Sequence, residues 1–493
     1  MKAFESEGMW WLPAASDATP VAGVVSYEEH QRAVVTIIGS LDPDEALYRI
    51  SADPALVSPE VLQEISDLAS NAAEDASHGT EESSSSGLTQ TATARRVSEI
   101  PVLHGVINAR LISLLRLRTT HTSGDIPGPA CASYSFDVAV LGGHVAAYEE
   151  PYYVRCDLRF DQLDTWCGRV LLDAPQKVLR CSLDDGTVME LWLSRGGSIG
   201  MLKQTETKAH VISLKFPGER ALSDIVRSFV PPWQNLLTTC VGVPCCLTGV
   251  TVQSPSVTWG GGQTPLEVVF ADRLPRTSAE GQRNPYLLPL GLGDVVYEDF
   301  LPQWIATHDK YEVATQFAYA PTYSSAEHPE MRLMSAATAM EAFRSVKLPL
   351  RRTPFLDKSP AVDLILSEFP EAEHPLLRER LKHFNDPSFR ERLTDLASNA
   401  GELFQPIAGE RLEAWVSLVV KTRNKIAHGS KGRPSGAAQL AMAEALQFLV
   451  EMSLLLEAGV SLDALLGKAS ADPRYRWLIE LRQLYLDQLM AKS

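Results

Sequence analysis

The sequence predicts an α+β protein of several domains. It has a β-rich, antiparallel sandwich or barrel-like N-terminal domain over residues 1–300 and an all-α helical bundle over residues 301–493. Two observations predict this division. Short runs rich in β-branched and aromatic residues dominate the first part. From about Leu301, apolar residues recur instead at i, i+3, i+4 spacing. The length of 493 residues allows roughly two to four domains.

The strand predictions come from apolar runs that lie close to Gly, Pro or Asp residues. In the run that ends at Phe160, Val154 and Leu158 share one face while charged residues point to the other, as in a half-buried strand. One helix is predicted within this domain, at Ala221–Val230. The predicted strands are Val21–Val25, Ala33–Ile38, Ile112–Arg118, Tyr134–Leu141, Tyr152–Phe160, Val188–Ser194, Val211–Phe216 and Leu266–Phe270.

One segment of the N-terminal half departs from this pattern. Ser70–Arg96 is rich in Ser, Thr, Ala and Glu and contains almost no large apolar side chains. Such a segment cannot bury enough surface to offset the entropy of ordering it. We therefore predict a disordered surface loop over about residues 70–98.

The C-terminal domain is predicted to be a bundle, because its apolar stripes repeat with a helical period and are separated by short connections. The predicted helices are Trp304–Tyr319, Pro329–Val346, Ala361–Phe369, Pro375–Asn385, Phe389–Ala397, Arg411–His428, Ser435–Ala458 and Arg476–Met490.

Charge is unevenly distributed along the chain, whose net charge is −16. Residues 1–300 carry 22 basic and 37 acidic residues, whereas residues 301–493 carry 23 and 24. An acidic N-terminal half excludes a general nucleic-acid coat. However, no Asp or Glu occurs between Glu413 and Glu444, where five basic residues fall. This segment could bind one polyanion locally, or it could be an ordinary solvated helix end.

Cysteine usage and the apolar segments predict a cytoplasmic protein. All seven cysteines lie between Cys131 and Cys246, their number is odd, and none shows the C-x2-C spacing of a zinc site. The first residues, MKAFESEGMWW, contain no apolar core of a signal peptide. The longest uncharged stretch, Ser228–Leu266, is broken by prolines. We expect no membrane association, no metal and no cofactor.

The predicted helix Arg411–His428 carries the residues best suited to chemistry. Arg423 falls in the middle of its apolar stripe, where an unpaired cation is costly. Asn424 and His428 are i, i+4 neighbours on the flank of the helix, and Gly429 is a natural helix stop. The surrounding cations, which we predict to bind substrate, are Lys421, Lys425, Lys431 and Arg433.

This set suits the cleavage of an RNA phosphodiester. Histidine titrates near neutrality and can accept the 2′-hydroxyl proton or protonate the 5′-oxygen, and arginine matches phosphate oxygens. One histidine cannot easily be both base and acid in a single step, so a two-fold homodimer would supply the second. The alternative is structural: the arginine pairs with a buried glutamate, and the histidine only caps helix carbonyls.

The segment TRNKIAHG, Thr422–Gly429, resembles the R-x(4–6)-H signature of HEPN domains. MRLMSAATAMEAFRS, which contains Glu341, resembles an earlier HEPN helix. More narrowly, GMWWLP, LGGHVAAYEE at Leu141–Glu150 and FDQLDTWCG at Phe160–Gly168 resemble the N-terminal domain of ApeA-like HEPN proteins of prokaryotic anti-phage defence. The resemblance covers nearly the whole chain.

The resemblance implies a metal-independent endoribonuclease that works as a homodimer or higher homo-oligomer on RNA. Arg423 and His428 would be the catalytic pair, Asn424 a supporting residue, and Glu341 a residue that orients Arg423. The N-terminal domain would sense a phage-derived trigger or otherwise regulate the nuclease. The alternative is a non-catalytic HEPN scaffold for dimerisation or nucleotide binding, with a ligand-binding N-terminal domain.

Overall fold

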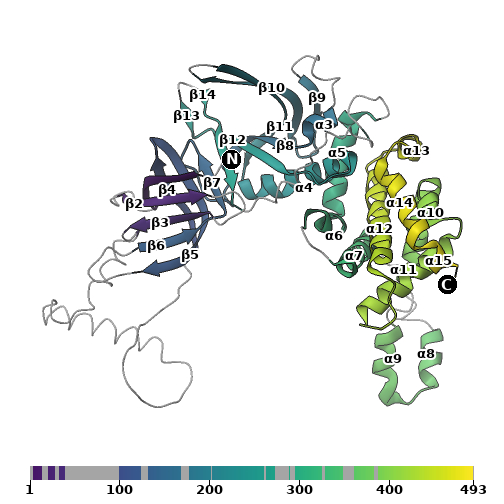
Figure 1. Cartoon of the computed structure of the whole chain (residues 1–493). Helices are drawn as coiled ribbons and strands as arrows, with labels where there is room; N and C mark the ends of the chain where they lie inside the picture. Colours follow the sequence, from purple (N-terminus) through teal and green to yellow (C-terminus); the bar gives the residue numbers. More distant parts are fainter. Residues whose placement is uncertain are drawn as a thin grey trace, which may run out of the picture. The chain divides into compact units, whose positions relative to one another are not determined.

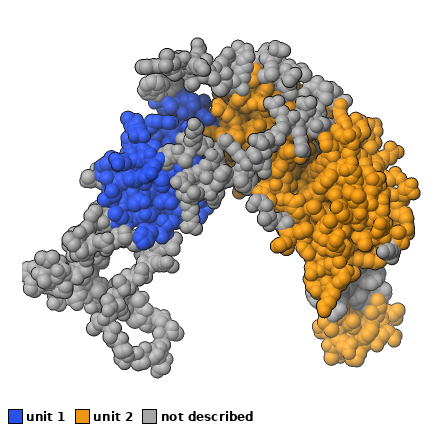
Figure 2. All heavy atoms as spheres, viewed as in Figure 1, with its two compact units in different colours: residues 1–154, 219–222, 251–273 blue, residues 155–218, 223–250, 274–493 orange. Residues whose placement is uncertain are grey.

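The computed structural model divides into two compact units, which Figure 2 colours separately. Unit 1 comprises residues 1–154, 219–222 and 251–273, and unit 2 comprises residues 155–218, 223–250 and 274–493. The loop predicted at residues 70–98 lies outside the described residues. The structure describes residues 4–13, 20–27, 33–38, 41, 99–123, 131–167, 177–200, 203–259, 262–271, 288, 295–324, 328–347, 360–381 and 387–491.

Unit 1 is built on an antiparallel barrel. The six strands of the barrel follow the order β4-β1-β2-β3-β6-β5, and a β4–β5 pairing closes the ring. Strands β7 and β15 extend the sheet from β5. The strands are β1 (Phe4–Trp11), β2 (Val21–Tyr27), β3 (Val34–Ile38), β4 (Glu99–Ile107), β5 (Arg110–Ser123), β6 (Cys131–Ser135), β7 (Val138–Leu141), β15 (Leu266–Phe270) and the short pair β13 (Thr258–Trp259) and β14 (Gly262–Gln263).

Alternating side chains fill the barrel. In β2 and β3 every second residue is buried, as expected for strands with one face on a core. Trp10 is fully buried at the centre. A Cβ atom at Gly105 would lie 2.4 Å from the Trp10 ring, so the absence of a side chain at this position makes room for the indole.

The first part of unit 2 is a second run of strands, ordered β12-β8-β11-β10-β9, with two helices. β10 and β11 form a long antiparallel hairpin. The elements are β8 (Tyr153–Phe160), α3 (Leu163–Cys167), β9 (Lys177–Ser182), β10 (Val188–Gly200), β11 (Lys203–Arg220), α4 (Leu222–Val241) and β12 (Leu247–Gln253).

The rest of unit 2 is a helical bundle around α12, which packs against α5, α6, α7, α10 and α14 (Figure 1). α12 is long and apolar enough to cross a membrane, but 83% of its apolar window is buried inside the structure, as in the central helix of a bundle. The helices are α5 (Tyr297–Lys310), α6 (Glu312–Tyr323), α7 (Pro329–Lys347), α8 (Pro360–Ser367), η2 (Glu371–Glu373), α9 (His374–Leu381), α10 (Phe389–Ala408), α11 (Leu412–Ala427), α12 (Gly436–Glu457), α13 (Leu462–Ala469), α14 (Pro473–Tyr485) and α15 (Asp487–Met490).

The predicted fold class, a β-rich N-terminal region followed by a helical bundle, is confirmed. Some element bounds differ. The predicted helix Phe389–Ala397 continues to Ala408 across a kink at Gly401, whose φ is +48°. The predicted strand Tyr134–Leu141 is two strands separated by two residues. The division into domains at residue 300 stays a prediction.

Candidate active site

Helix α11 holds the predicted catalytic residues and is anchored by its apolar face. Trp415, Val416 and Val419 are fully buried, and Trp415 packs edge-on against the Phe404 ring of α10 with centroids 5.1 Å apart. The predicted apolar stripe is therefore the face that docks α11 in the bundle. The prediction that Arg423 lies in the middle of that stripe is wrong: it lies at the border of the buried face and is partly exposed.

The end of α11 is a Schellman motif, which places His428 on the surface. Gly429 adopts a φ of +62° and donates from its N–H to the Ile426 carbonyl at 3.1 Å. The Ser430 N–H donates to the Lys425 carbonyl at 2.8 Å. His428 is thus the last residue before the chain turns away, and its side chain is exposed.

Arg423 is held by three groups. Its Nη2 donates to Glu341 Oε2 of α7 at 3.2 Å, and its Nη1 donates to Asn424 Oδ1 at 3.3 Å. The guanidinium lies over the Phe389 ring of α10, 5.2 Å from the centroid. Its Nε is buried without a hydrogen-bond partner among the described residues. The guanidinium is therefore fixed in direction, yet its side chain keeps 28% of its surface exposed.

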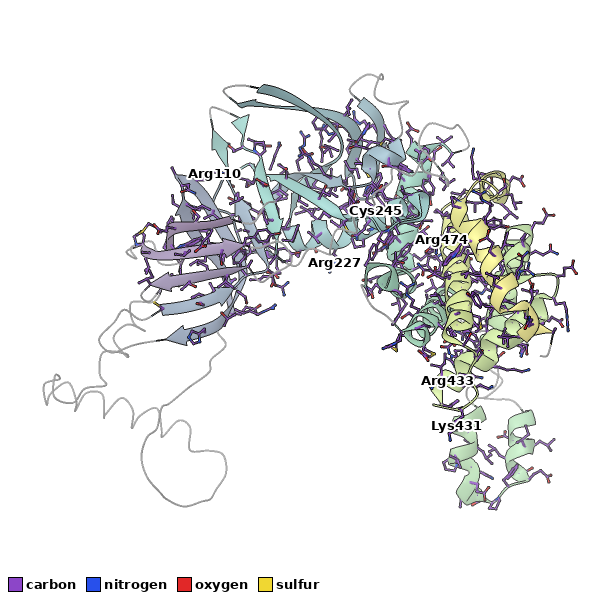
Figure 3. All side chains as sticks on the ribbon, viewed as in Figure 1. Arg110, Arg227, Cys245, Lys431, Arg433 and Arg474 are labelled. Carbon is purple, nitrogen blue, oxygen red and sulfur yellow. The ribbon has the colours of Figure 1, made fainter. Side chains whose placement is uncertain are left out.

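The predicted substrate-binding cations differ in how they are held. Lys425 Nζ donates to the Gly432 carbonyl at 2.8 Å, and Arg433 lies 3.8 Å from Glu330 on α7. Lys421 and Lys431 are exposed. Figure 3 shows Lys431 and Arg433 together at the lower end of the helical bundle.

The structure places five of the predicted site residues in two neighbouring groups. Lys421, Asn424 and His428 follow one another at i, i+3 or i+4 spacing along the exposed side of α11. Arg423 lies beside them and meets Glu341, which is 32% exposed. An imidazole, a fixed guanidinium and an amide at one exposed helix end can together engage a phosphodiester.

Residues from α10 and α7 also border this site, and the sequence did not single them out. Phe389 supports Arg423, and Arg392 Nη1 donates to Ser345 Oγ of α7 at 2.7 Å. The only signal was the S-x-x-E pattern of Ser388 and Glu391, which forms a capping box at the start of α10. That pattern marks where a helix begins, but it does not show which helix the arginine reaches.

The N-terminal motifs have structural roles. In unit 1, the His104 and His144 rings stack with centroids 4.4 Å apart, and Trp11 meets His144 edge-on. Burial lowers the pKa of His104, which favours its neutral form in this stack. In unit 2, Trp166 is fully buried and donates from its ring N–H to the Leu288 carbonyl at 2.9 Å.

The comparisons with known proteins agree with this architecture. Residues 334–464, which run from within α7 to the first residues of α13, match the family described as Apea-like HEPN. Residues 5–260, more than half of the chain, match ApeA N-terminal domain 1. No curated protein and no solved structure matches the chain. The order of the two matched domains and their extent show that the chain belongs to the ApeA-like HEPN family.

Proposed function

We propose that this protein is an anti-phage endoribonuclease whose HEPN domain cleaves RNA through Arg423 and His428. The observation that carries the proposal is the end of α11, where an exposed imidazole follows a guanidinium fixed by Glu341 and Asn424. The family supports it, because HEPN domains are generally associated with ribonuclease activity and ApeA-type proteins with anti-phage defence.

The proposed reaction is an attack by the 2′-hydroxyl on the adjacent phosphorus. The His428 imidazole accepts the hydroxyl proton, the new P–O bond closes a 2′,3′-cyclic phosphate, and the P–O5′ bond breaks. The departing 5′-oxygen takes a proton from an imidazolium and leaves as a 5′-hydroxyl. Arg423 compensates the charge that builds up on the phosphate oxygens.

A second copy of the chain completes the site in this proposal. The neighbours of His428 on α11 offer cations and amides, and among the described residues no hydrogen bond or ring contact joins it to a second imidazole. In a two-fold homodimer the same helix end from each copy would meet, so that one His428 acts as base and the other as acid. A dimer with one inactive subunit would then lose either the base or the acid, so that cleavage by the whole dimer would be impaired.

The ion pair between Arg423 and Glu341 bears on the scaffold alternative. An arginine locked to a glutamate in a dry core would have no access to substrate. Here both side chains keep about three tenths of their surface exposed. Their accessibility favours a working site over a structural one.

We further propose that the β-rich N-terminal domain holds the nuclease inactive until a phage-derived trigger binds; full activity of the intact protein without any trigger would contradict this.

The test is incubation of the purified full-length protein with total RNA in the presence of EDTA. Without a trigger, the wild type is expected to show a low basal cleavage that leaves 5′-hydroxyl and 2′,3′-cyclic phosphate ends, and His428→Ala is expected to leave RNA intact. His374→Ala, which removes a histidine of the same domain from outside the site, is the matched control and should cleave like the wild type. Cleavage that survives His428→Ala, or that requires magnesium, would overturn the mechanism.

A further inference from the structure

The first turn of α10 carries two arginines that are each held by a serine hydroxyl from a neighbouring helix. Arg392 Nη1 donates to Ser345 Oγ of α7 at 2.7 Å, and its Nε donates to the Pro387 carbonyl at 3.0 Å. Arg390 Nη2 donates to Ser417 Oγ of α11 at 3.3 Å. A hydroxyl is a neutral acceptor, so it positions a guanidinium without cancelling its charge.

These two charges are not compensated by ion pairs. Among the described residues, no carboxylate lies within 4.0 Å of Arg390 or Arg392. Arg344 and Arg423, by contrast, pair with Asp395 and Glu341. The intervening Glu391 accepts from the backbone N–H of Ser388 at 2.7 Å in the capping box, which lowers the pKa of its carboxyl. The start of α10 therefore presents positioned but unneutralised cations.

Arg392 lies close to the candidate catalytic arginine. Glu341 and Ser345, which hold Arg423 and Arg392, are i, i+4 neighbours on α7, about 6 Å apart along its axis. Phe389 of the same α10 turn lies under the Arg423 guanidinium. The groups that hold the two guanidiniums thus lie about one helical turn apart along α7, a spacing that successive phosphates of one nucleotide chain can match.

We infer that Arg392, with Arg390 as a weaker outer contact, binds the phosphate next to the scissile one and so guides single-stranded RNA along α10 to Arg423 and His428. The inference rests on the proposed function of that site. Guanidinium contacts to phosphate fix the register of a strand without reading its sequence. Arg390 contributes less because the hollow that it borders is also lined by Glu410 and Glu413, whose negative charges offset the positive charges of Arg390 and Arg411.

The test measures binding apart from cleavage. A labelled single-stranded RNA is titrated with full-length protein carrying His428→Ala, at salt concentrations between about 50 and 200 mM. Adding Arg392→Gln is expected to weaken binding about fivefold and to lower the slope of log affinity against log salt by about 0.7. Arg392→Lys should keep most of the slope, and Arg390→Gln should have a smaller effect than Arg392→Gln.

Arg227→Gln is the matched control. It removes the same charge from α4, where Arg227 pairs with Asp224, and Figure 3 shows it away from Lys431 and Arg433. The affinity of this variant for the RNA, and the dependence of that affinity on salt, should not change. If Arg392→Gln behaves like this control while the wild type still cleaves RNA, the phosphate contact is wrong and the proposed function stands. If the wild type fails to cleave RNA but Arg392→Gln still lowers affinity and slope, the contact stands and the nuclease does not.

Discussion

Glu341 on α7 accepts a hydrogen bond from Arg423 on α11, with 3.2 Å between Oε2 and Nη2. An ion pair with this much exposure stabilises a fold by at most about 1 kcal/mol. Its main consequence is geometric, because a long flexible side chain is held in one direction next to Asn424 and above Phe389. Glu341 is therefore a positioning residue for Arg423.

Replacing Glu341 should impair cleavage far more than stability. In Glu341→Gln the amide can still touch Arg423, but the charge that fixes the guanidinium is lost. We expect the cleavage rate to fall roughly ten- to hundredfold, and the free energy of unfolding to change by less than about 1 kcal/mol. Initial rates on a labelled RNA and urea unfolding curves measure the two quantities.

A double-mutant cycle separates this role from a general effect of charge. In an Arg423→Ala background, Glu341→Gln should add little further loss, because the group it positions is absent. Glu330→Gln removes a carboxylate from the same helix, where it pairs with Arg433, and should change the rate less than about twofold. Equal losses in Glu341→Gln and Glu330→Gln would contradict a positioning role.

The turn after His428 should be sensitive to a single methyl group. Gly429 has a φ of +62°, and an added Cβ would meet no atom within 4 Å, so Gly429→Ala is strained only in its backbone. We expect a loss of about 1 kcal/mol in the free energy of unfolding and a lower cleavage rate, because His428 lies at the residue before the turn.

Gly467→Ala is the matched control for that substitution. Gly467 lies inside α13, also with open space around its missing Cβ. Because alanine favours a helix over glycine, this variant should be stabilised by up to about 1 kcal/mol and should keep its activity. Loss of stability in both variants would show that the conformation of Gly429 is not the cause.

How far the sequence predicts this molecule can be judged from particular elements. The period of α11 and the glycine after His428 were enough to predict the helix, the residue at which it ends and the centre of its buried face at Trp415, Val416 and Val419. The barrel strands β2 and β3 were predicted from β-branched runs. Strand β1, FESEGMWW, was not predicted, because its charged first half hides the alternation that the partner strands impose.

The contacts between helices could not be predicted from the sequence. The contact between Glu341 and Arg423 was predicted only as one alternative. Spacing along a helix does not show which other helix lies opposite it. The contact between Arg392 and Ser345 was not predicted, because nothing in the sequence shows that the start of α10 lies against α7. The kink at Gly401 was also missed, because a glycine after a helical run normally indicates an end, whereas here the helix resumes.

His308 should make the fold sensitive to mild acid. The imidazole is buried on α5, Asn235 Nδ2 lies 2.9 Å from its Nε2, and burial lowers its pKa to about 4. The unfolded chain binds a proton below about pH 6.5 and the folded chain does not, so stability is complete above that pH. It falls as the pH drops from about 6.5 to 4, by roughly 3 kcal/mol.

Urea unfolding at pH 7.0 and 5.0 measures this effect. His308→Gln keeps a hydrogen-bonding group for Asn235 but cannot titrate, so its stability should vary less between the two pH values than that of the wild type. His428→Ala removes an exposed imidazole and should keep the pH dependence of the wild type. An unchanged pH dependence in His308→Gln would show that other groups control acid sensitivity.

The ion pair between Glu451 on α12 and Arg474 on α14 should be a major support of the bundle. Arg474 Nη1 donates to Glu451 Oε2 at 2.5 Å, Gln447 donates to Oε1 at 2.9 Å, and only 1% of the Glu451 side chain is exposed. In Glu451→Ala the guanidinium, whose side chain is only 18% exposed, loses this partner, and the carboxylates that remain near it are those of Glu444, at 3.9 Å, and Asp472. We expect a loss of about 3–5 kcal/mol in the free energy of unfolding.

The double variant Glu451→Leu, Arg474→Met distinguishes a buried charge from lost packing. It removes both charges and keeps apolar volume between α12 and α14, so most of the lost stability should return. Urea unfolding of the single and double variants at pH 7 provides the comparison. If the double variant is as unstable as Glu451→Ala, the cost lies in packing rather than in an unpaired Arg474. Because α7 and α11 keep their own contacts, the folded double variant should cleave RNA at the wild-type rate.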